Sequence, residues 1–183
     1  MVKVALISGS LRKESISTKI AKAVGELFPE GYEAQFVDIG SLPMYNEDLE
    51  TDNPPAEYTA FRNAIKESDA VLFVTPEYNR SFSGAIKNAV DVGSRPYGQA
   101  SLEGKPAAII SQSMGNLGGF GANHHLRQTL VFLNMPLLQQ PEAYIGNSGD
   151  LFDENGKIKN PDTTQFLQSF VNAFVDLINR YNR

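Results

Sequence analysis

The residues AVLFVTPEYNRSFSG, numbers 70 to 84, decide the fold of this chain. The run from Ala70 to Thr75 is apolar and rich in β-branched residues, which predicts a strand buried on both faces. Pro76 cannot donate a ladder hydrogen bond, so we expect it to end the strand. Ser83 is a candidate N-cap for a helix over 85–94. The polar segment between them leaves the carboxyl end of a buried strand, where open α/β sheets bind ligands.

Apolar strands alternate with amphipathic helices on both sides of this stretch. The predicted strands lie at 3–8, 33–39, 70–75 and 106–111, with a fifth inside 137–145. The predicted helices run from a cap at Ser15 or Ser17 to Phe28, over 56–67, 85–94 and 122–135, and from Asp162 or Thr163 to Tyr181. This pattern predicts an α/β fold with a parallel sheet and helices on both faces, and five strands favour the flavodoxin-like order 2-1-3-4-5.

The composition excludes several classes of protein. The 183 residues suit one domain, 1–183, and the net charge of −5 argues against a nucleic-acid binder. There is no cysteine, so disulfides, Cys-ligated zinc and thiol catalysis are excluded. No apolar run reaches the length of a membrane span, and the N-terminus has no signal-peptide layout. We therefore expect a cytoplasmic protein without a membrane partner.

The loop after the first predicted strand has the composition of a phosphate site. Gly9 allows close approach of the backbone, the following residues carry several hydroxyls, and Arg12 offers a fork that matches phosphate oxygens. The next helix adds free N–H groups and the positive end of its dipole. A Ser-rich helix cap with a solvated arginine is the alternative interpretation.

Two more loops leave the same predicted edge. In the loop after Thr75, Tyr78 can stack on a flat ring and Asn79 offers donors and an acceptor. The loop over 112–121 is glycine-rich and can form the wall of a planar ligand. An ordinary strand–helix connection and a mobile surface loop are the respective alternatives.

Other features favour structural roles. Phe166, Phe170 and Phe174 recur every four residues and predict a core stripe. His124 and His125 are adjacent, so on a helix they cannot share a metal ion, and we expect packing or an interface instead. Glu77 is a possible catalytic acid, but a bond to backbone or to a partner subunit is the favoured interpretation.

Motifs of other nucleotide and hydrolase sites are absent from the sequence. There is no Walker A motif, no G-x-G-x-x-G and no G-x-S-x-G elbow. Strand three ends in Thr75 where a phospho-receiver domain needs an aspartate. These absences exclude a P-loop and argue against a Rossmann NAD site.

Three groups of residues carry a family resemblance. They are GSLRK at 9–13 with Ser15, TPEYN at 75–79 with Lys87-Asn88-Ala89 downstream, and SMG at 113–115 followed by HLRQ at 125–128. The chain resembles the NAD(P)H-dependent FMN reductases, which include bacterial chromate and quinone reductases and small azoreductases. The similarity runs from Lys3 to about Tyr144.

The resemblance implies a flavodoxin-like fold, one FMN per subunit, and homodimers that sometimes pair into tetramers. It implies that residues of the first loop hold the FMN phosphate and that the other two loops hold the ring and ribityl chain. The implied cofactor-binding residues are Ser10, Arg12, Ser15, Ile16, Ser17, Pro76, Glu77, Tyr78, Asn79, Ser113 and Gly115. Many relatives carry Asn in place of Ser17 and Phe in place of Ile16. Arg80 stands at a variable position, where we expect it to tune substrate entry.

The implied activity is hydride transfer from NADH or NADPH to FMN, and then to a quinone, azo compound, free flavin or metal oxyanion, in a ping-pong cycle. FMN carries this chemistry, so no catalytic side chain is predicted. Backbone N–H groups near Asn79 and Gly115 would stabilise negative charge on the reduced ring. The helices at 84–94 and 122–135 are expected to form a two-fold dimer interface. The alternatives are an FMN-binding electron carrier or redox sensor without NAD(P)H turnover, and a flavin-free phosphoester-binding enzyme.

Overall fold

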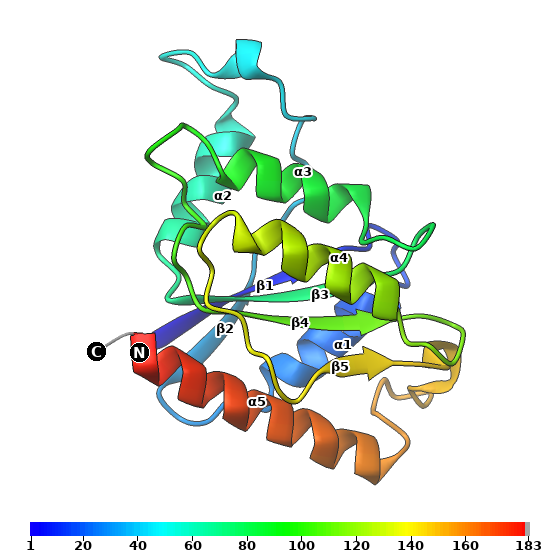
Figure 1. The fold of residues 1–183 in the computed structure, drawn as a ribbon. Coiled ribbons are helices and arrows are strands. Elements are labelled where there is room, and N and C mark those ends of the chain that lie inside the picture. The colour runs from blue at the N-terminus through cyan, green and yellow to red at the C-terminus, as the bar shows by residue number, and fades with distance from the viewer. Residues whose placement is uncertain (182–183) are drawn as a thin grey trace.

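A five-stranded parallel sheet forms the centre of the computed structural model, which describes residues 1–181 (Figure 1). The strand order is β2-β1-β3-β4-β5, so the predicted flavodoxin-like order is confirmed. The strands are β1 (Val2–Ser8), β2 (Tyr32–Phe36), β3 (Ala70–Pro76), β4 (Ala107–Gln112) and β5 (Ala143–Ile145). Every pair of neighbouring strands is parallel.

Five α-helices cover the two faces of the sheet (Figure 1). They are α1 (Ile16–Gly25), α2 (Ala56–Lys66), α3 (Gly84–Gly93), α4 (Phe120–Val131) and α5 (Pro161–Tyr181), with short 3₁₀ helices η1 (Glu47–Leu49) and η2 (Ser148–Asp150). One apolar core packs α2, α3 and α4 against the sheet, and a second core packs α1 and α5 against the opposite face. This two-sided packing follows from strands whose residues are apolar at successive positions.

All seven residues of β3 are buried, as the sequence predicts for the central strand. Phe73 points into the core that holds Phe61, while Leu72 points into the core that holds Phe170 and Phe174. The predicted phenylalanine stripe is therefore confirmed as core, with Phe166 partly buried against it.

Two predicted elements near the N-terminus end earlier than expected. The helix predicted to reach Phe28 ends at Gly25, because the N–H of Leu27 bonds the carbonyl of Val24 in a tighter turn. The strand predicted over 33–39 covers Tyr32–Phe36, because the Asp38 carboxylate accepts hydrogen bonds from the Gly40 N–H and the Ser41 hydroxyl. Such a local turn competes with strand pairing.

Further boundaries also differ from prediction. The helix expected over 122–135 covers Phe120–Val131, and the chain then turns with Asn134 at a φ of 52°. The strand expected over 106–111 covers 107–112, and β3 includes Pro76, which pairs with Gln112. The last helix begins at Pro161, and the side chain of Asn160, not Asp162 or Thr163, accepts the free N–H of its first turn.

The long connection at 40–55 is held by side chains of the neighbouring helices. The buried Asn88 side chain of α3 accepts from the Tyr45 N–H and donates to the carbonyls of Leu42 and Pro43. The guanidinium of Arg62 on α2 forms a bidentate ion pair with Glu50. These contacts give the segment a packing role. None of the helices described within residues 1–181 is both long and apolar enough to cross a membrane.

Candidate functional site

The loops after β1, β3 and β4 begin at one edge of the sheet. Register places Ser8 beside Val74, and Pro76 beside Gln112, so the three strands end within about two residues of one another. The exposed residues 78–80 and 114–117 stand at this edge. The predicted meeting of three loops is therefore confirmed. Its position at the carboxyl ends of the strands is where open α/β sheets bind ligands.

The first loop presents a row of free backbone donors. Ser15 is the N-cap of α1, with its hydroxyl oxygen accepting from the Thr18 N–H at 3.0 Å, and this settles the predicted choice between Ser15 and Ser17. Within the described chain, the N–H groups of residues 10–17 donate to no protein acceptor. Backbone donors at a helix N-terminus fit a phosphate group, because each can donate to an anionic oxygen.

Gly9 lets this loop lie close to the start of α3. A Cβ at Gly9 would lie 2.7 Å from both Ile86 Cδ1 and Ser83 Oγ, so a side chain there would displace these two side chains or the loop. The hydroxyls of Ser8 and Thr18 are hydrogen-bonded to each other at 2.8 Å. Ser83 caps α3, as predicted, by accepting from the Ile86 N–H.

The charged groups around the first loop favour binding of an anion there. A cavity of about 510 Å³ opens beside Ser10 and Arg12 and is bounded on its other side by residues 36–40. Hydrogen bonds from the Ser41 hydroxyl and the Gly40 N–H lower the pKa of Asp38, so this carboxyl is ionised at neutral pH. An anion is therefore repelled from the Asp38 side and attracted to Arg12 and the N-terminus of α1.

The predicted residues of the first loop differ in their exposure. Arg12 is exposed and Ser10 is half-buried, so both side chains reach the cavity. Ser15 and Ser17 are buried and Ile16 packs against the core, so these three residues offer an anion their backbone N–H groups. Their part in phosphate binding stays a prediction that this geometry permits.

The second loop contains a tight two-residue turn. Tyr78 and Ser81 exchange hydrogen bonds of 2.9 and 3.0 Å, with Asn79 at a φ of 50° and Arg80 at 66°. The half-exposed Tyr78 ring stands at the rim. Asparagine tolerates a positive φ, whereas arginine adopts it at a cost. The turn thus holds Arg80 outward in a strained conformation, and such strain clusters at functional sites.

Glu77 connects the second loop to α4. One carboxylate oxygen accepts from the Ala122 N–H at 2.9 Å, in the first turn of a helix whose N-cap, Gly119, offers no side chain. The favoured interpretation of Glu77 as a partner of backbone is confirmed. One oxygen of its carboxylate is therefore engaged with the first turn of α4.

The third loop is held against β5. The Ser113 N–H donates to the Ile145 carbonyl at 3.1 Å, and the Asn147 N–H donates to the Gly115 carbonyl at 3.2 Å. Gly118, at a φ of 58°, lies so close that a Cβ would be 2.6 Å from the backbone of Tyr144. The loop is thus a fixed wall in its second half, while 114–117 stay exposed.

The two adjacent histidines are exposed and contact neighbouring side chains, which is consistent with either predicted role, packing or an interface. His124 contacts the Tyr144 hydroxyl at 2.9 Å and lies against the Phe120 ring, and His125 bonds the Ser81 hydroxyl at 2.8 Å. Burial, together with the Glu142 carboxylate, raises the pKa of Tyr144 to about 12, so this hydroxyl stays protonated at neutral pH.

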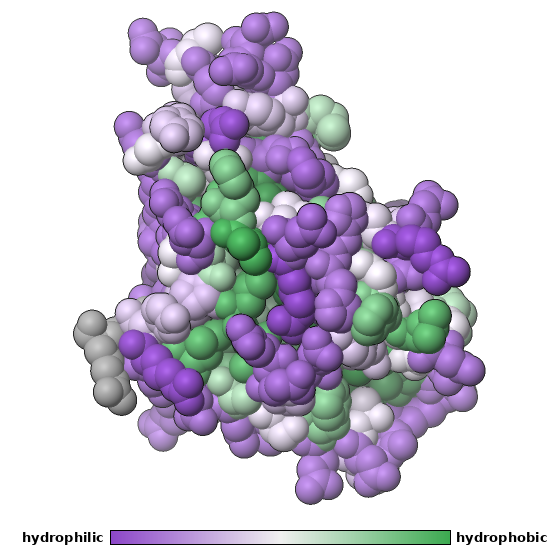
Figure 2. Space-filling model, in the orientation of Figure 1, coloured by the Kyte–Doolittle hydropathy of each residue, from purple (hydrophilic) through white to green (hydrophobic). Residues whose placement is uncertain are grey.

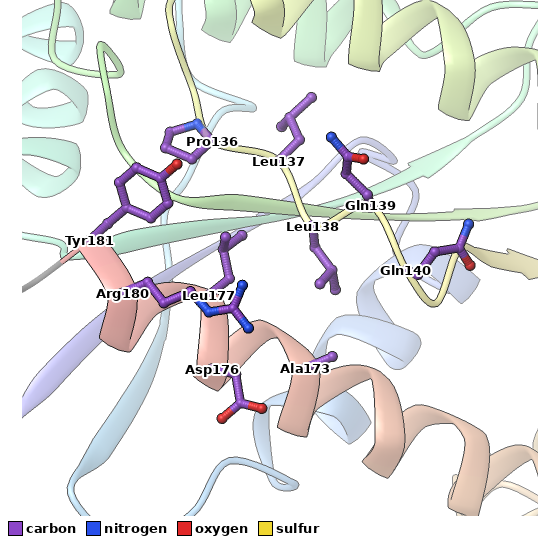
Figure 3. Close-up of a pocket in the computed structure, with 10 residues that line it drawn as sticks. All are labelled: Pro136, Leu137, Leu138, Gln139, Gln140, Ala173, Asp176, Leu177, Arg180 and Tyr181. Carbon is purple, nitrogen blue, oxygen red and sulfur yellow. The ribbon is translucent and has the colours of Figure 1, made fainter.

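A second cavity lies away from the loops. Its volume is about 470 Å³, and it opens between residues 136–140 and the C-terminal half of α5, with Leu138, Leu177 and Arg180 among its lining (Figure 3). Leu137 pairs with Ala107 at the amino end of β4, so this cavity lies at the opposite edge of the sheet. None of the predicted site residues lines it.

Comparison with known proteins identifies the family of the chain. The family model described as NADPH-dependent FMN reductase matches residues 2–150. The chain belongs to the NADPH-dependent FMN reductase family. It is therefore an oxidoreductase with the flavodoxin-like fold, and the matched range includes all three loops.

Relatives of the chain are similar over nearly their whole length. A quinone reductase of Pseudomonas putida KT2440 is 55% identical over 96% of this chain and 94% of its own. An NAD(P)H-dependent FMN reductase of Pseudomonas aeruginosa is 42% identical over 94% and 92%. Among solved structures, FerB of Paracoccus denitrificans, a flavoenzyme NAD(P)H:(acceptor) oxidoreductase, has a TM-score of 0.92 and 42% identity, covering 99% of both chains.

Two buried polar residues at this edge are not among the site residues predicted from the sequence. Gln112, at the end of β4, and Ser148, in η2, are buried and hydrogen-bonded to each other. Ser148 is only 1% exposed, although it lies in a polar stretch of the sequence. No local pattern marks these residues, because their partners lie far away in the sequence.

The positive φ of Arg80, in the turn between Tyr78 and Ser81, leads to a prediction about the stability of this FMN reductase. Replacing Arg80 by glycine should raise the free energy of unfolding by up to about 1 kcal/mol, because glycine adopts positive φ without strain. Urea unfolding monitored by circular dichroism measures this change. Asn134→Gly is the matched control and should gain less, since asparagine already tolerates its φ of 52°. A loss of stability in Arg80→Gly would show that the arginine side chain makes a stabilising contact.

Proposed function

We propose that this family member is a homodimeric FMN-containing enzyme that oxidises NADH or NADPH and reduces a quinone. The observation that carries the proposal is the row of unpaired backbone N–H groups at 10–17, beside Arg12. This arrangement fits a phosphomonoester better than a flat apolar substrate, because it can satisfy several anionic oxygens. The names of the relatives support the quinone and the nicotinamide co-substrate.

In this proposal each loop has one task. The N–H groups of 10–17 and the Arg12 guanidinium bind the phosphate. The segment from Pro76 to Asn79, with Ser113 and Gly115, borders the ring. When bound, FMN supplies the redox chemistry, taking a hydride from the nicotinamide and passing two electrons to the acceptor. Backbone N–H groups at the rim would donate hydrogen bonds that stabilise negative charge on the reduced ring.

No side chain is assigned a catalytic proton transfer. Glu77 is engaged with α4, and both histidines are engaged in packing. The protein therefore contributes binding, orientation and electrostatics. The same site admits azo compounds, free flavins and metal oxyanions as acceptors, and the cytoplasm, where reduced nicotinamides are made, is the expected compartment.

The test is a spectrum followed by an assay. The purified protein, incubated with FMN and desalted, should show the absorbance of bound oxidised flavin. It should then oxidise NADH or NADPH when a benzoquinone is added, and steady-state rates with both nicotinamides and a panel of acceptors rank the substrates. Bound flavin without NAD(P)H oxidation would favour an electron carrier, and protein that retains no flavin would contradict the proposal.

The proposal of a dimer rests on the face formed by α3 and α4. A groove of about 340 Å³ runs between these helices, and Phe132, just after α4, is 80% exposed, with Val131 also exposed. Figure 2 shows a narrow apolar strip on this side of the molecule, flanked by hydrophilic residues. Exposed aromatic side chains beside a groove are typical of protein interfaces. We propose that a second copy covers this face and completes the rim.

Replacing Phe132 by glutamate should therefore convert the dimer to a monomer, because the interface would have to bury an unpaired charge. Size-exclusion chromatography with light scattering measures the molar mass. Tyr181→Glu, at an exposed aromatic residue of α5, is the control and should remain dimeric. A Phe132→Glu protein with the wild-type mass would place the interface elsewhere.

A further inference from the structure

Gln112 joins two parts of the site between which the described residues form no other hydrogen bond. Its Nε2 donates to the Ser17 hydroxyl at 3.0 Å, and its Oε1 accepts from the Ser148 hydroxyl at 2.6 Å. Gln112 is 7% exposed, Ser17 0% and Ser148 1%. Both ends of the amide are thus satisfied in the interior by residues 95 and 36 positions away in the sequence.

Ser17 belongs to the phosphate end of the proposed site. It lies in the first turn of α1, directly after the Ser15 cap, within the row of free N–H groups. A hydrogen bond to its hydroxyl therefore restrains the turn that presents these groups to an anion.

Ser148 belongs to the ring end of the proposed site. Its backbone N–H donates to the Ser113 carbonyl at 3.1 Å, beside the bond from Asn147 to Gly115. The segment 145–148 therefore holds the loop that begins at Ser113, and the hydroxyl of Ser148 attaches this segment to Gln112.

The sheet topology makes Gln112 a bridge. β1 and β4 are separated by β3, so no backbone ladder joins the end of β1 to the end of β4. Among the described residues, the bond from Gln112 to Ser17 is the only hydrogen bond between segments 8–18 and 111–119. A buried polar network whose members are all satisfied restrains the elements that it connects.

We propose that Gln112 is a positioning residue that couples the phosphate-binding turn to the wall of the ring pocket. Binding of a phosphate at 10–17 then orders the loop at 113–119 through Ser17, Gln112 and Ser148. The inference rests on the proposed function, because it assigns the two coupled segments to opposite ends of FMN. The coupling means that binding at the phosphate end increases the affinity at the ring end, and the reverse.

Hydrogen exchange tests the coupling without activity. In the wild type, adding inorganic phosphate should slow amide exchange in both 10–17 and 113–119. In Gln112→Leu, which keeps the approximate volume but loses both bonds, phosphate should slow exchange in 10–17 alone. Equal protection of 113–119 in the variant, or no phosphate effect on 113–119 in the wild type, would overturn the coupling.

Flavin binding gives a second readout. Gln112→Leu should raise the Kd for FMN about tenfold, which corresponds to a lost coupling of about 1.4 kcal/mol between the two ends of the site, and should shift the midpoint potential of the bound flavin. Ser148→Ala should produce a smaller change in the same direction. Unchanged affinity and potential in Gln112→Leu would contradict the positioning role.

The matched control is Gln168→Leu on α5, which removes a part-buried glutamine bond to the Leu27 carbonyl away from the site. It should lower stability in urea but leave both the flavin potential and exchange at 113–119 unchanged. If the control shows the same changes, a general loss of stability explains them and the proposal fails. If the wild type binds no FMN, the proposed function fails, and the phosphate experiment still decides the coupling.

Discussion

Replacing Arg12 by alanine is expected to weaken FMN binding by about 1.5–3 kcal/mol, the usual contribution of a hydrogen bond to a charged group. This corresponds to a rise in Kd of roughly ten- to a hundredfold. The guanidinium is exposed at the cavity beside the free N–H groups, opposite the ionised Asp38. Fluorescence quenching of FMN, titrated with apoprotein, measures the Kd.

A titration with riboflavin distinguishes a contact to the phosphate from a contact to the ring. Riboflavin lacks the phosphate, so its affinity should be nearly the same for the wild type and for Arg12→Ala. Lys13→Ala is the matched control, since it removes a neighbouring exposed charge that lies outside the cavity lining. Retention of FMN at wild-type affinity, or an equal loss for riboflavin, would refute the phosphate assignment.

Replacing Glu50 by alanine is expected to lower the free energy of unfolding by about 3–5 kcal/mol, the usual effect of removing one partner of a buried ion pair. Arg62 is 6% exposed, and its guanidinium bonds Glu50 with both terminal nitrogens and the Val92 carbonyl with Nε. Without Glu50 its charge stays buried and only partly compensated. Urea denaturation at neutral pH measures the change.

Two comparisons make this result interpretable. Asp91→Ala breaks the exposed pair with Lys87 and should cost less than about 1 kcal/mol. The double variant Glu50→Leu with Arg62→Met removes both charges and should recover most of the lost stability. A small effect of Glu50→Ala alone would mean that water reaches Arg62 and that 40–55 is held mainly by Asn88.

Local sequence patterns predicted most of the fold. The central strand, the cap at Ser83, a cap at Ser15 or Ser17, and the phenylalanine stripe all follow from periodicity and capping chemistry, which act over a few residues. Helix and strand ends were less predictable. The Asp38 turn and the Asn160 cap each depend on which nearby side chain takes a free N–H group, and several candidates were chemically equivalent.

The sequence by itself determined the alternation of strands and helices, and with it the edge where three loops meet, because hydrophobic periodicity and turn chemistry are local. The tertiary structure alone decided what the polar groups of that edge do. Glu77 faces α4, Ser17 is buried, and Gln112 reaches both Ser17 and Ser148. Partners separated by 36 to 95 residues are chosen by strand order and register, and no local pattern records that choice.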